Sequence, residues 1–209
     1  MPRDFNLYQF VLSMIALIIC ITIHEFAHAY SAWRAGDDTP KLQGRISLNP
    51  IDHLDPIGTV MMVLSSISGF GIGWGKPVRI NPGNFHSPRW GNFWVSLWGP
   101  LANLFTAMVA GVILRLLGAS MPGNVFHFVL IITFISITLA IFNLIPIAPL
   151  DGSHILSSLL PREHAIKYDM FMGRYGFLIF LALIFLLPDV LPAIMGPPSR
   201  FLLHLFVGV

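Results

Sequence analysis

Two histidines and a glutamate share one helical turn of an apolar segment, in the run Ile23-His-Glu-Phe-Ala-His28. Residues four apart lie on one face of a helix, so His24 and His28 could hold one Zn²⁺ while Glu25 beside them acts as a general base. The alternative is a chance match, with histidines that snorkel or form hydrogen bonds within a helix. In hydrocarbon these three groups are costly unless they coordinate, pair or face a wet cavity, which favours the zinc interpretation. Cys20, four residues earlier, is interpreted as a small apolar filler rather than a fourth ligand.

The composition is that of a polytopic membrane protein. Of 209 residues, 55% are hydrophobic and 11% are charged, and the mean hydropathy is +0.74. A formal net charge of +2 is too small to argue for nucleic acid as a partner. The length leaves room for about four spans with short loops in a single domain, residues 1–209.

Apolar runs predict four membrane spans, at about 6–33, 91–118, 124–150 and 173–195. The first run could be mistaken for a signal peptide cleaved after Ala27-His-Ala29. We interpret it as a retained span, because its start carries no net positive charge and cleavage there would destroy the histidine motif. The tail at 201–209 is too short to cross.

The apolar run at 56–72 differs from the four spans. It opens with Asp55-Pro56, contains three serines and ends in a glycine-rich stretch, so its backbone is poorly suited to a straight lipid-facing helix. We expect a re-entrant or tilted element there. The following stretch, residues 75–82, carries prolines near both ends and predicts an edge strand or short β hairpin at the membrane surface. The expected fold class is therefore an all-α polytopic membrane protein with about four transmembrane helices, a re-entrant element and a surface β hairpin.

Basic residues orient these spans if 56–72 does not cross. Nine of the twelve lysines and arginines then lie on one side, which predicts a multi-pass protein of the cell membrane with that side in the cytoplasm and the N-terminus outside. If 56–72 did cross, the split would be more even and Asp151 would lie on the opposite face from His24. The nine are Arg34, Lys41, Arg45, Lys76, Arg79, Arg89, Arg162, Lys167 and Arg174, and the three are Arg3, Arg115 and Arg200.

A second chemical constellation is the run Asn143-Leu-Ile-Pro-Ile-Ala-Pro-Leu-Asp-Gly152. An aspartate after a proline-broken apolar helix needs a positive partner, and a zinc with two histidines lacks a third protein ligand. Asp151 could instead belong to a surface turn or cap a helix that begins at Ser153. His154 shares the face of Asp151 and competes as ligand, but the proline and glycine break centres on Asp151. At about 1.5 Å per helical residue, His24, His28 and Asp151 reach one level.

Asn103 closes a third run, Gly99-Pro-Leu-Ala-Asn103, at a similar depth. Its amide could donate to a scissile carbonyl oxygen or orient the attacking water. It could equally bond a neighbouring helix beside the proline kink, and spacing alone does not choose. His53, between Asp52 and Asp55, is expected to be a surface loop histidine, with a second polar cluster near the active-site entrance as the alternative.

These three motifs together resemble the site-2 protease family, intramembrane zinc metalloproteases of the peptidase M50 type. Two further runs resemble its compact bacterial branch. They are Leu48-Asn-Pro-Ile-Asp-His-Leu-Asp-Pro56 and Gly73-Trp-Gly-Lys-Pro-Val78. The match covers about residues 20–155 in the right order. Relative to longer members of the family, we expect no extra leading span and no PDZ or CBS domain in this chain.

The resemblance implies one Zn²⁺ per chain held by His24, His28 and Asp151, with Glu25 as general base and Asn103 near the substrate or oxyanion. It implies cleavage of transmembrane protein substrates within or near the lipid bilayer. We expect water to reach the site from the cytoplasmic face, and an edge strand near 76–81 to pair with an unwound substrate. The rival class is a membrane scaffold or transporter whose buried His, Glu and Asp carry a proton or metal ion. A transporter favours internal repeats or paired broken helices, and the sequence shows neither.

Overall fold

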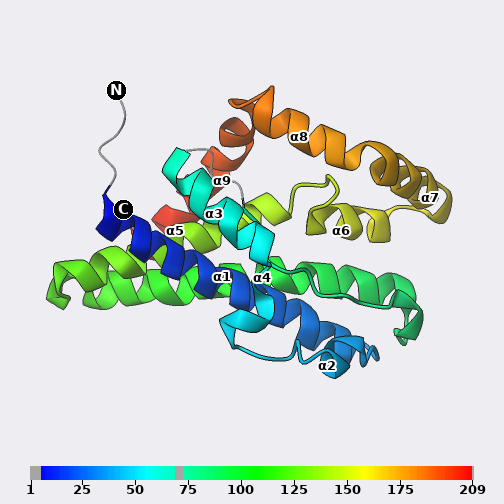
Figure 1. Ribbon diagram of the computed structural model, residues 1–209, viewed down its shortest axis with the longest axis horizontal. Coiled ribbons are helices and arrows are strands. Elements are labelled where there is room, and N and C mark those ends of the chain that lie inside the picture. Colours follow the sequence, from blue (N-terminus) through cyan, green and yellow to red (C-terminus); the bar gives the residue numbers. More distant parts are fainter. Residues whose placement is uncertain (1–5, 69–72, 209) are drawn as a thin grey trace.

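The computed structural model describes the backbone of residues 6–68 and 73–208, and the side chains of residues 6–64 and 73–208. The described residues form helices joined by turns and loops, and they form no sheet (Figure 1). The long helices are α1 (Leu7–Arg34), α4 (Pro88–Leu117), α5 (Gly123–Asn143) and α9 (Val190–Val207). The shorter ones are α2 (Thr39–Leu42), α3 (Pro56–Ser68), α6 (Asp151–Leu159), α7 (Arg162–Phe171) and α8 (Phe177–Phe185), with one π-helical turn at Met172–Gly176. Short 3₁₀ turns lie at Pro50–His53, Pro82–Asn84 and Gly118–Ser120.

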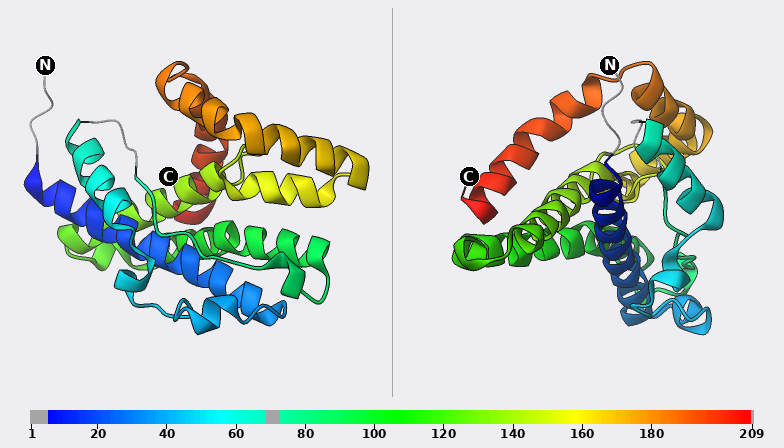
Figure 2. Two further views of the ribbon diagram at one scale, coloured as in Figure 1. Left: turned by 45° about the vertical axis from the view of Figure 1, so that its right-hand side comes forward. Right: turned by 60° about the vertical axis from the view of Figure 1, so that its left-hand side comes forward.

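Three long helices, α1, α4 and α5, pack together as the centre of the molecule (Figures 1 and 2). Their buried positions are mostly small. Examples are Ala16 and Ala32 of α1, Ala107 of α4 and Ala140 of α5, each fully buried. Their exposed positions include large apolar side chains such as Phe105, which is 63% exposed. Small residues between helices and large apolar residues outside are the pattern of helices packed in lipid, where backbones approach closely and the exterior meets acyl chains.

Among the described residues, five helical stretches are long and apolar enough to cross a membrane: Leu7–Arg34, Pro88–Ser120, Gly123–Asn143, Arg162–Phe185 and Val190–Val207. This differs from the expected four. The predicted span at 173–195 is interrupted, because α8 ends at Phe185 and α9 begins at Val190. The tail at 201–209, expected to be too short on its own, is mostly the second half of α9. Pro188 and Asp189 fall in the break, and a proline removes a helical hydrogen bond there.

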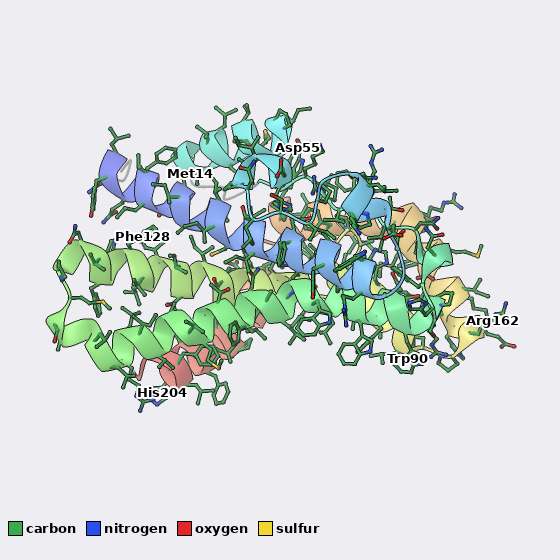
Figure 3. The ribbon with its side chains drawn as sticks, turned by 90° about the horizontal axis from the view of Figure 1, so that it is seen from below. Met14, Asp55, Trp90, Phe128, Arg162 and His204 are labelled. Atoms are coloured by element: carbon green, nitrogen blue, oxygen red, sulfur yellow. The ribbon has the colours of Figure 1, made fainter. Side chains whose placement is uncertain are left out.

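The region from α7 to α9 extends from the start of α4 to its end. Near the start of α4, Arg89 donates to the carbonyls of Ser158 and Leu160 just before α7. Near the end of α4, the Arg115 guanidinium lies 3.5 Å from the Leu205 carbonyl of α9. Figure 3 shows the same order, with Trp90 of α4 and Arg162 of α7 near one end of the bundle and His204 of α9 near the other. Arg89 and Arg115 therefore connect the two ends of α4 to the two ends of the region from α7 to α9.

The run at 56–72 forms α3, a helix of 13 residues, and its glycine-rich end at 69–72 lies outside the described residues. At about 1.5 Å per residue, 13 residues reach roughly 20 Å, which is short of the ~30 Å of a bilayer core. That the run at 56–72 enters the membrane without crossing it stays a prediction.

The predicted β hairpin is wrong for the described residues. Residues 73–80, here called the 73–80 segment, form no strand, and one isolated antiparallel bridge joins Gly75 to Leu54. The physical reason is that other groups already bind its backbone. Lys76 N–H donates to the His53 carbonyl at 2.8 Å, and the Lys76 carbonyl accepts from Arg45. Pro77 and Pro82 remove two further donors that a ladder would use.

A buried carboxylate fastens the far end of this segment to α1. Asp37 is fully buried and accepts hydrogen bonds from Thr39 N–H, the Thr39 hydroxyl, Asn81 N–H and the Asn84 amide, at 3.1, 2.6, 2.7 and 2.9 Å. Gly36 precedes it with φ +111°, and a Cβ there would lie 2.9 Å from the Asn84 carbonyl. Burial alone would raise the pKa of the Asp37 carboxyl, but hydrogen bonds from Thr39, Asn81 and Asn84 hold that pKa below its ordinary value.

We expect Asp37→Asn to lower the free energy of unfolding by about 2 kcal/mol near pH 7, because hydrogen bonds to a charged acceptor are lost. The folded-state pKa of Asp37 is depressed, so its stabilisation is present above the unfolded pKa of about 4 and is lost as the pH falls through the folded pKa. The difference between wild type and variant should therefore shrink below about pH 4. Thermal unfolding in detergent measures this, with exposed Asp38→Asn as the matched control. Equal effects of the two variants would contradict the assignment.

Candidate metal centre

Helix α1 presents two imidazoles to one point. His24 and His28 lie one turn apart and are 7% and 8% exposed. Their rings meet edge to face at 84°, with 4.6 Å between centroids. The two Nε2 atoms lie 3.0 Å apart. The four-residue spacing therefore does what helical geometry predicts and aims both nitrogens at a shared position.

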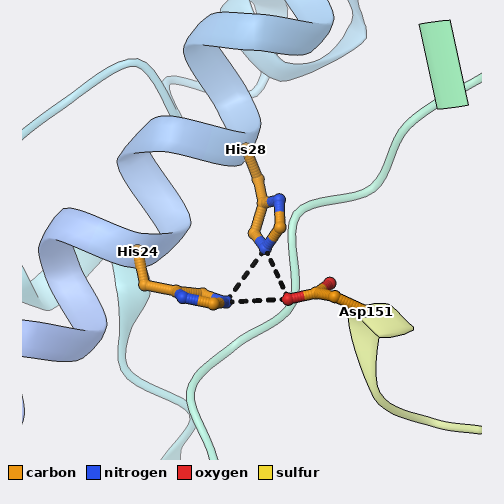
Figure 4. A group of neighbouring side chains, drawn as sticks. All are labelled: His24, His28 and Asp151. Carbon is orange, nitrogen blue, oxygen red and sulfur yellow. Dashed lines mark hydrogen bonds and ion pairs between the residues drawn. The ribbon is translucent and has the colours of Figure 1, made fainter. Parts of the chain in front are cut away.

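Helix α6 brings a carboxylate to the same point (Figure 4). Asp151 is the first residue of α6, and its Oδ2 lies 3.1 Å from His24 Nε2 and 3.2 Å from His28 Nε2. The proline-containing turn after α5 folds back closely onto the start of α6. A Cβ on Gly152 would lie 2.4 Å from the carbonyl oxygens of both Leu144 and Ile145, so a side chain at that position would push α6 away.

The hydrogens of these side chains cannot satisfy every buried acceptor in the cluster. His28 Nδ1–H donates to the Val95 carbonyl at 2.7 Å, so the lone pair of His28 lies on Nε2. His24 can donate its Nε2 hydrogen to His28, with Asn103 Nδ2 donating to His24 Nδ1 at 3.1 Å. Two buried oxygens then accept no hydrogen bond from the described residues, namely Asp151 Oδ2 and Asn103 Oδ1. Buried polar atoms without partners are costly and mark a missing ion or water.

A cation at the shared position would bind the lone pair of the orphaned Asp151 Oδ2. If the Asn103 amide is rotated by 180°, its Oδ1 accepts from His24 Nδ1–H and the His24 lone pair turns to Nε2. Three lone pairs then converge from two imidazoles and a carboxylate, the donor set of catalytic zinc sites. Tetrahedral bonds of about 2.0–2.2 Å place donors roughly 3.3–3.5 Å apart, close to the separations above. The residues therefore fit a zinc ion.

Asn103 was predicted to lie near the substrate or to bond a neighbouring helix. The structure has its amide against His24 of α1, and its side chain is fully buried. This geometry favours a role in fixing the tautomer and orientation of His24, as hydrogen-bond partners of metal-bound histidines do.

Gly99, in the same motif as Asn103, has a function that the sequence reasoning did not assign. Its Cα faces the two rings of α1. A Cβ at this position would lie 2.3 Å from His28 Nε2 and 2.7 Å from His24 Cε1. Pro100 follows inside α4, and both residues are buried. Absence of a side chain at Gly99 is what lets α4 approach α1 at the level of the histidines.

The Glu25 carboxylate contacts the 73–80 segment. Its Oε2 accepts a hydrogen bond from Val78 N–H at 3.1 Å. The Arg45 guanidinium lies 3.9 Å from the same oxygen. Burial lowers the pKa of the Arg45 guanidinium, while Glu25 and Asp52 raise it. An arginine stays protonated in proteins, so Glu25 faces a positive neighbour.

Three other residues considered from the sequence lie outside the cluster. His154 is exposed on α6 and lines a separate cavity of about 790 Å³ with Arg89 and Asn92. Cys20 is buried, and its Sγ lies 3.1 Å from the Ser136 hydroxyl of α5. The expectation that His53 lies at the surface is wrong. His53 is fully buried, because its Nε2 reaches the Ser47 carbonyl at 2.6 Å and its turn packs on α1.

Comparison with known proteins places this geometry in a family context. The family model described as "Peptidase family M50" matches residues 110–187. A protein of Bacillus subtilis (strain 168) named "Putative zinc metalloprotease YwhC" is 38% identical over 177 residues, covering 81% of this chain and 78% of that protein. Rip2 of Mycobacterium tuberculosis (strain ATCC 25618 / H37Rv), described in the same words, is 30% identical over 182 residues, covering 87% of this chain and 69% of that protein. No solved structure gives a significant match.

We expect Gly99→Ala to reduce bound zinc by at least about tenfold, because the added methyl group displaces both imidazoles and misplaced ligands bind metal poorly. Elemental analysis of the purified protein measures the zinc content. Gly123→Ala is the matched control, since a Cβ at Gly123 has no neighbour within 4 Å. Full zinc content in Gly99→Ala would show that the rings can shift at little cost.

Proposed function

The chain belongs to peptidase family M50, and on that premise we propose that it cleaves membrane-protein substrates within or near the bilayer. It is a zinc metalloendopeptidase. The intramembrane character of the reaction is the proposal. The observation that carries it is the convergence of His24, His28 and Asp151 within 3.2 Å in a protein of long apolar helices. Family membership favours this activity over a transporter.

One zinc per chain would be held by His24 Nε2, His28 Nε2 and Asp151 Oδ2. Three protein ligands leave the fourth position open, as catalytic zinc requires. When bound, the ion supplies Lewis acidity that activates a water molecule and polarises the scissile carbonyl. Asn103 and the Val95 carbonyl hold the two imidazoles in the tautomers that present Nε2.

Glu25 would carry the proton. It follows His24 in α1 and does not belong to the group of three proposed ligands. A carboxylate there can accept the proton of the attacking water and pass it to the leaving amine. The bond from Val78 N–H to Oε2 restrains rotation of the carboxylate. A fixed base needs less reorganisation when the proton moves.

The substrate would be a transmembrane or membrane-proximal segment. An intact helix hides its backbone carbonyls, so the segment must unwind before cleavage. We place the N-terminus outside the cell membrane and the opening of the site toward the cytoplasm, because nine of twelve basic residues lie on the side of the α1–α4 connection. The short α3 supports an even number of crossings between His28 and Asp151, because α4 and α5 are then the two helices that cross between them.

We expect Glu25→Gln to keep zinc while cleavage of a transmembrane substrate falls by at least about 100-fold, because glutamine keeps the shape of the side chain and cannot accept the proton. Asp151→Ala should lose both zinc and cleavage, since it removes one of three ligands. The measurement is cleavage by protein reconstituted in liposomes, with zinc content of the same samples. Residual turnover of Glu25→Gln above about a hundredth of wild type would count against Glu25 as the base.

A topological test uses single cysteines in a Cys20→Ser background, where the serine hydroxyl can still reach Ser136. Cysteines at Lys41, Lys76 and Lys167 should react with an impermeant thiol reagent only from the cytoplasmic side, because the charge bias places all three there. A cysteine at Ser120 should react only from outside. External labelling at position 76 would mean that α3 crosses, and the proposed orientation would be wrong.

A further inference from the structure

A buried arginine lies beside the proposed base and takes no part in the metal cluster. Arg45 is 3% exposed and lies between α2 and the turn at Pro50–His53. Its Nη1 donates to the Asp52 carbonyl at 2.7 Å, and its Nη2 donates to the Lys76 carbonyl. A buried cation is costly unless it is paired and hydrogen-bonded. The two terminal nitrogens of the guanidinium therefore join two backbone segments that are far apart in the sequence, one at Asp52 and the other at Lys76.

One of these two segments delivers the hydrogen bond to Glu25. Lys76 is held on both sides, by Arg45 at its carbonyl and by the His53 carbonyl at its N–H. Two residues later, Val78 N–H donates to Glu25 Oε2. Between them Pro77 restricts the backbone, so holding Lys76 largely determines where the Val78 N–H points.

The segment also presses closely on α1 at this level. A Cβ on Gly75 would lie 2.7 Å from Ile21 Cγ2 and 3.8 Å from Glu25 Cγ. The backbone of the 73–80 segment thus lies directly on the turn of α1 that carries Glu25. A small displacement of Lys76 would move the Val78 donor away from the carboxylate.

We propose that Arg45 is a positioning residue that holds the 73–80 segment on Glu25, so that the Val78 N–H fixes the carboxylate for proton transfer. This inference rests on the proposed function, because it assigns how the base of that reaction is held. Arg45 acts through the backbone and touches neither substrate nor metal. Three hydrogen bonds connect the loop after α2 to the centre of α1. Arg45 donates to the carbonyls of Asp52 and Lys76, and Val78 N–H donates to Glu25.

The contacts favour positioning over a purely electrostatic role. The guanidinium lies 3.9 Å from Glu25 Oε2, beyond hydrogen-bond distance, whereas both of its terminal nitrogens bond carbonyl oxygens. A lysine would bring the same charge as a single point and could not present the same planar fork to both carbonyls. Arg45→Lys therefore separates charge from geometry.

Kinetics with a quantified transmembrane substrate tests the inference. We expect Arg45→Gln to lower kcat about 10- to 100-fold, because a misplaced catalytic group loses rate on that scale. KM should change by less than about twofold, and zinc per protein should stay at the wild-type level, since neither substrate nor ligands are touched. Arg45→Lys should recover little. Exposed Arg79→Gln, in the same segment, is the matched control and should behave as wild type.

Three kinetic outcomes would overturn the inference. Full recovery in Arg45→Lys would leave charge as the cause. A rise in KM with unchanged kcat would make the segment a substrate-binding element. A loss of activity that follows a loss of zinc would mean that Arg45 supports the overall fold rather than the position of Glu25.

Hydrogen exchange provides a readout that does not depend on activity. Peptides that cover residues 76–80 should exchange faster in Arg45→Gln, while peptides that cover His24 and His28 stay protected. Glu25→Ala should also expose the Val78 N–H, whereas Glu25→Gln should protect it, because its amide oxygen still accepts. Unchanged exchange in Arg45→Gln would overturn the inference even if the enzyme is active. A wild-type protein that cleaves nothing would refute the proposed function, and the exchange data would still decide on Arg45.

Discussion

Three lone-pair donors aimed at one point inside a largely apolar protein need a cation, and this requirement organises the rest of the molecule. With hydrogens alone, one carboxylate oxygen and one amide oxygen stay buried without partners. A metal at the shared position satisfies Asp151 Oδ2, and an Asn103 amide that turns its oxygen to His24 leaves the His24 Nε2 lone pair free for the same metal. α6 must then start where α1 presents its histidines, which fixes how the turn after α5 folds back. Helix packing here serves coordination geometry more than the burial of large side chains.

That packing depends on positions where side chains are absent. Gly99 admits the two imidazoles, Gly152 admits the carbonyls of the preceding turn, and Gly75 admits α1 against the 73–80 segment. In lipid, apolar side chains gain little by leaving the solvent, so close backbone approach and hydrogen bonds stabilise helix contacts instead. The hydrogen-bonded contact between Cys20 and Ser136 is of the same kind. These three glycines therefore mark close contacts between parts of the structure.

Sequence reasoning worked where the relevant physics is local. Helical spacing accounts for the pairing of His24 with His28, and length with hydropathy accounts for the long helices. It failed where distant groups decide. The stretch at 75–82 has the composition of an edge strand, but Arg45 and His53, more than twenty residues earlier, bind its backbone. His53 was assigned to the surface because acidic neighbours suggest a loop, and no local signal reports that its turn packs on α1. The break between α8 and α9 had a signal in Pro188, which hydropathy averaging conceals.

The two halves of the proposed catalytic machinery are held in different ways. Helices with buried small residues hold the zinc ligands, and such contacts change little without separating whole helices. The base is instead held through a non-helical segment, fastened by Asp37 at its far end and by Arg45 near its middle. A scissile segment must lie beside both the metal and Glu25, so one side of its path is rigid helix and the other is backbone held by a few hydrogen bonds. The 73–80 segment, which contacts the base, is thus the side of this path that can move more easily. A substrate that displaced this segment would reach the metal, but it would also remove the Val78 hydrogen bond that positions the Glu25 carboxylate.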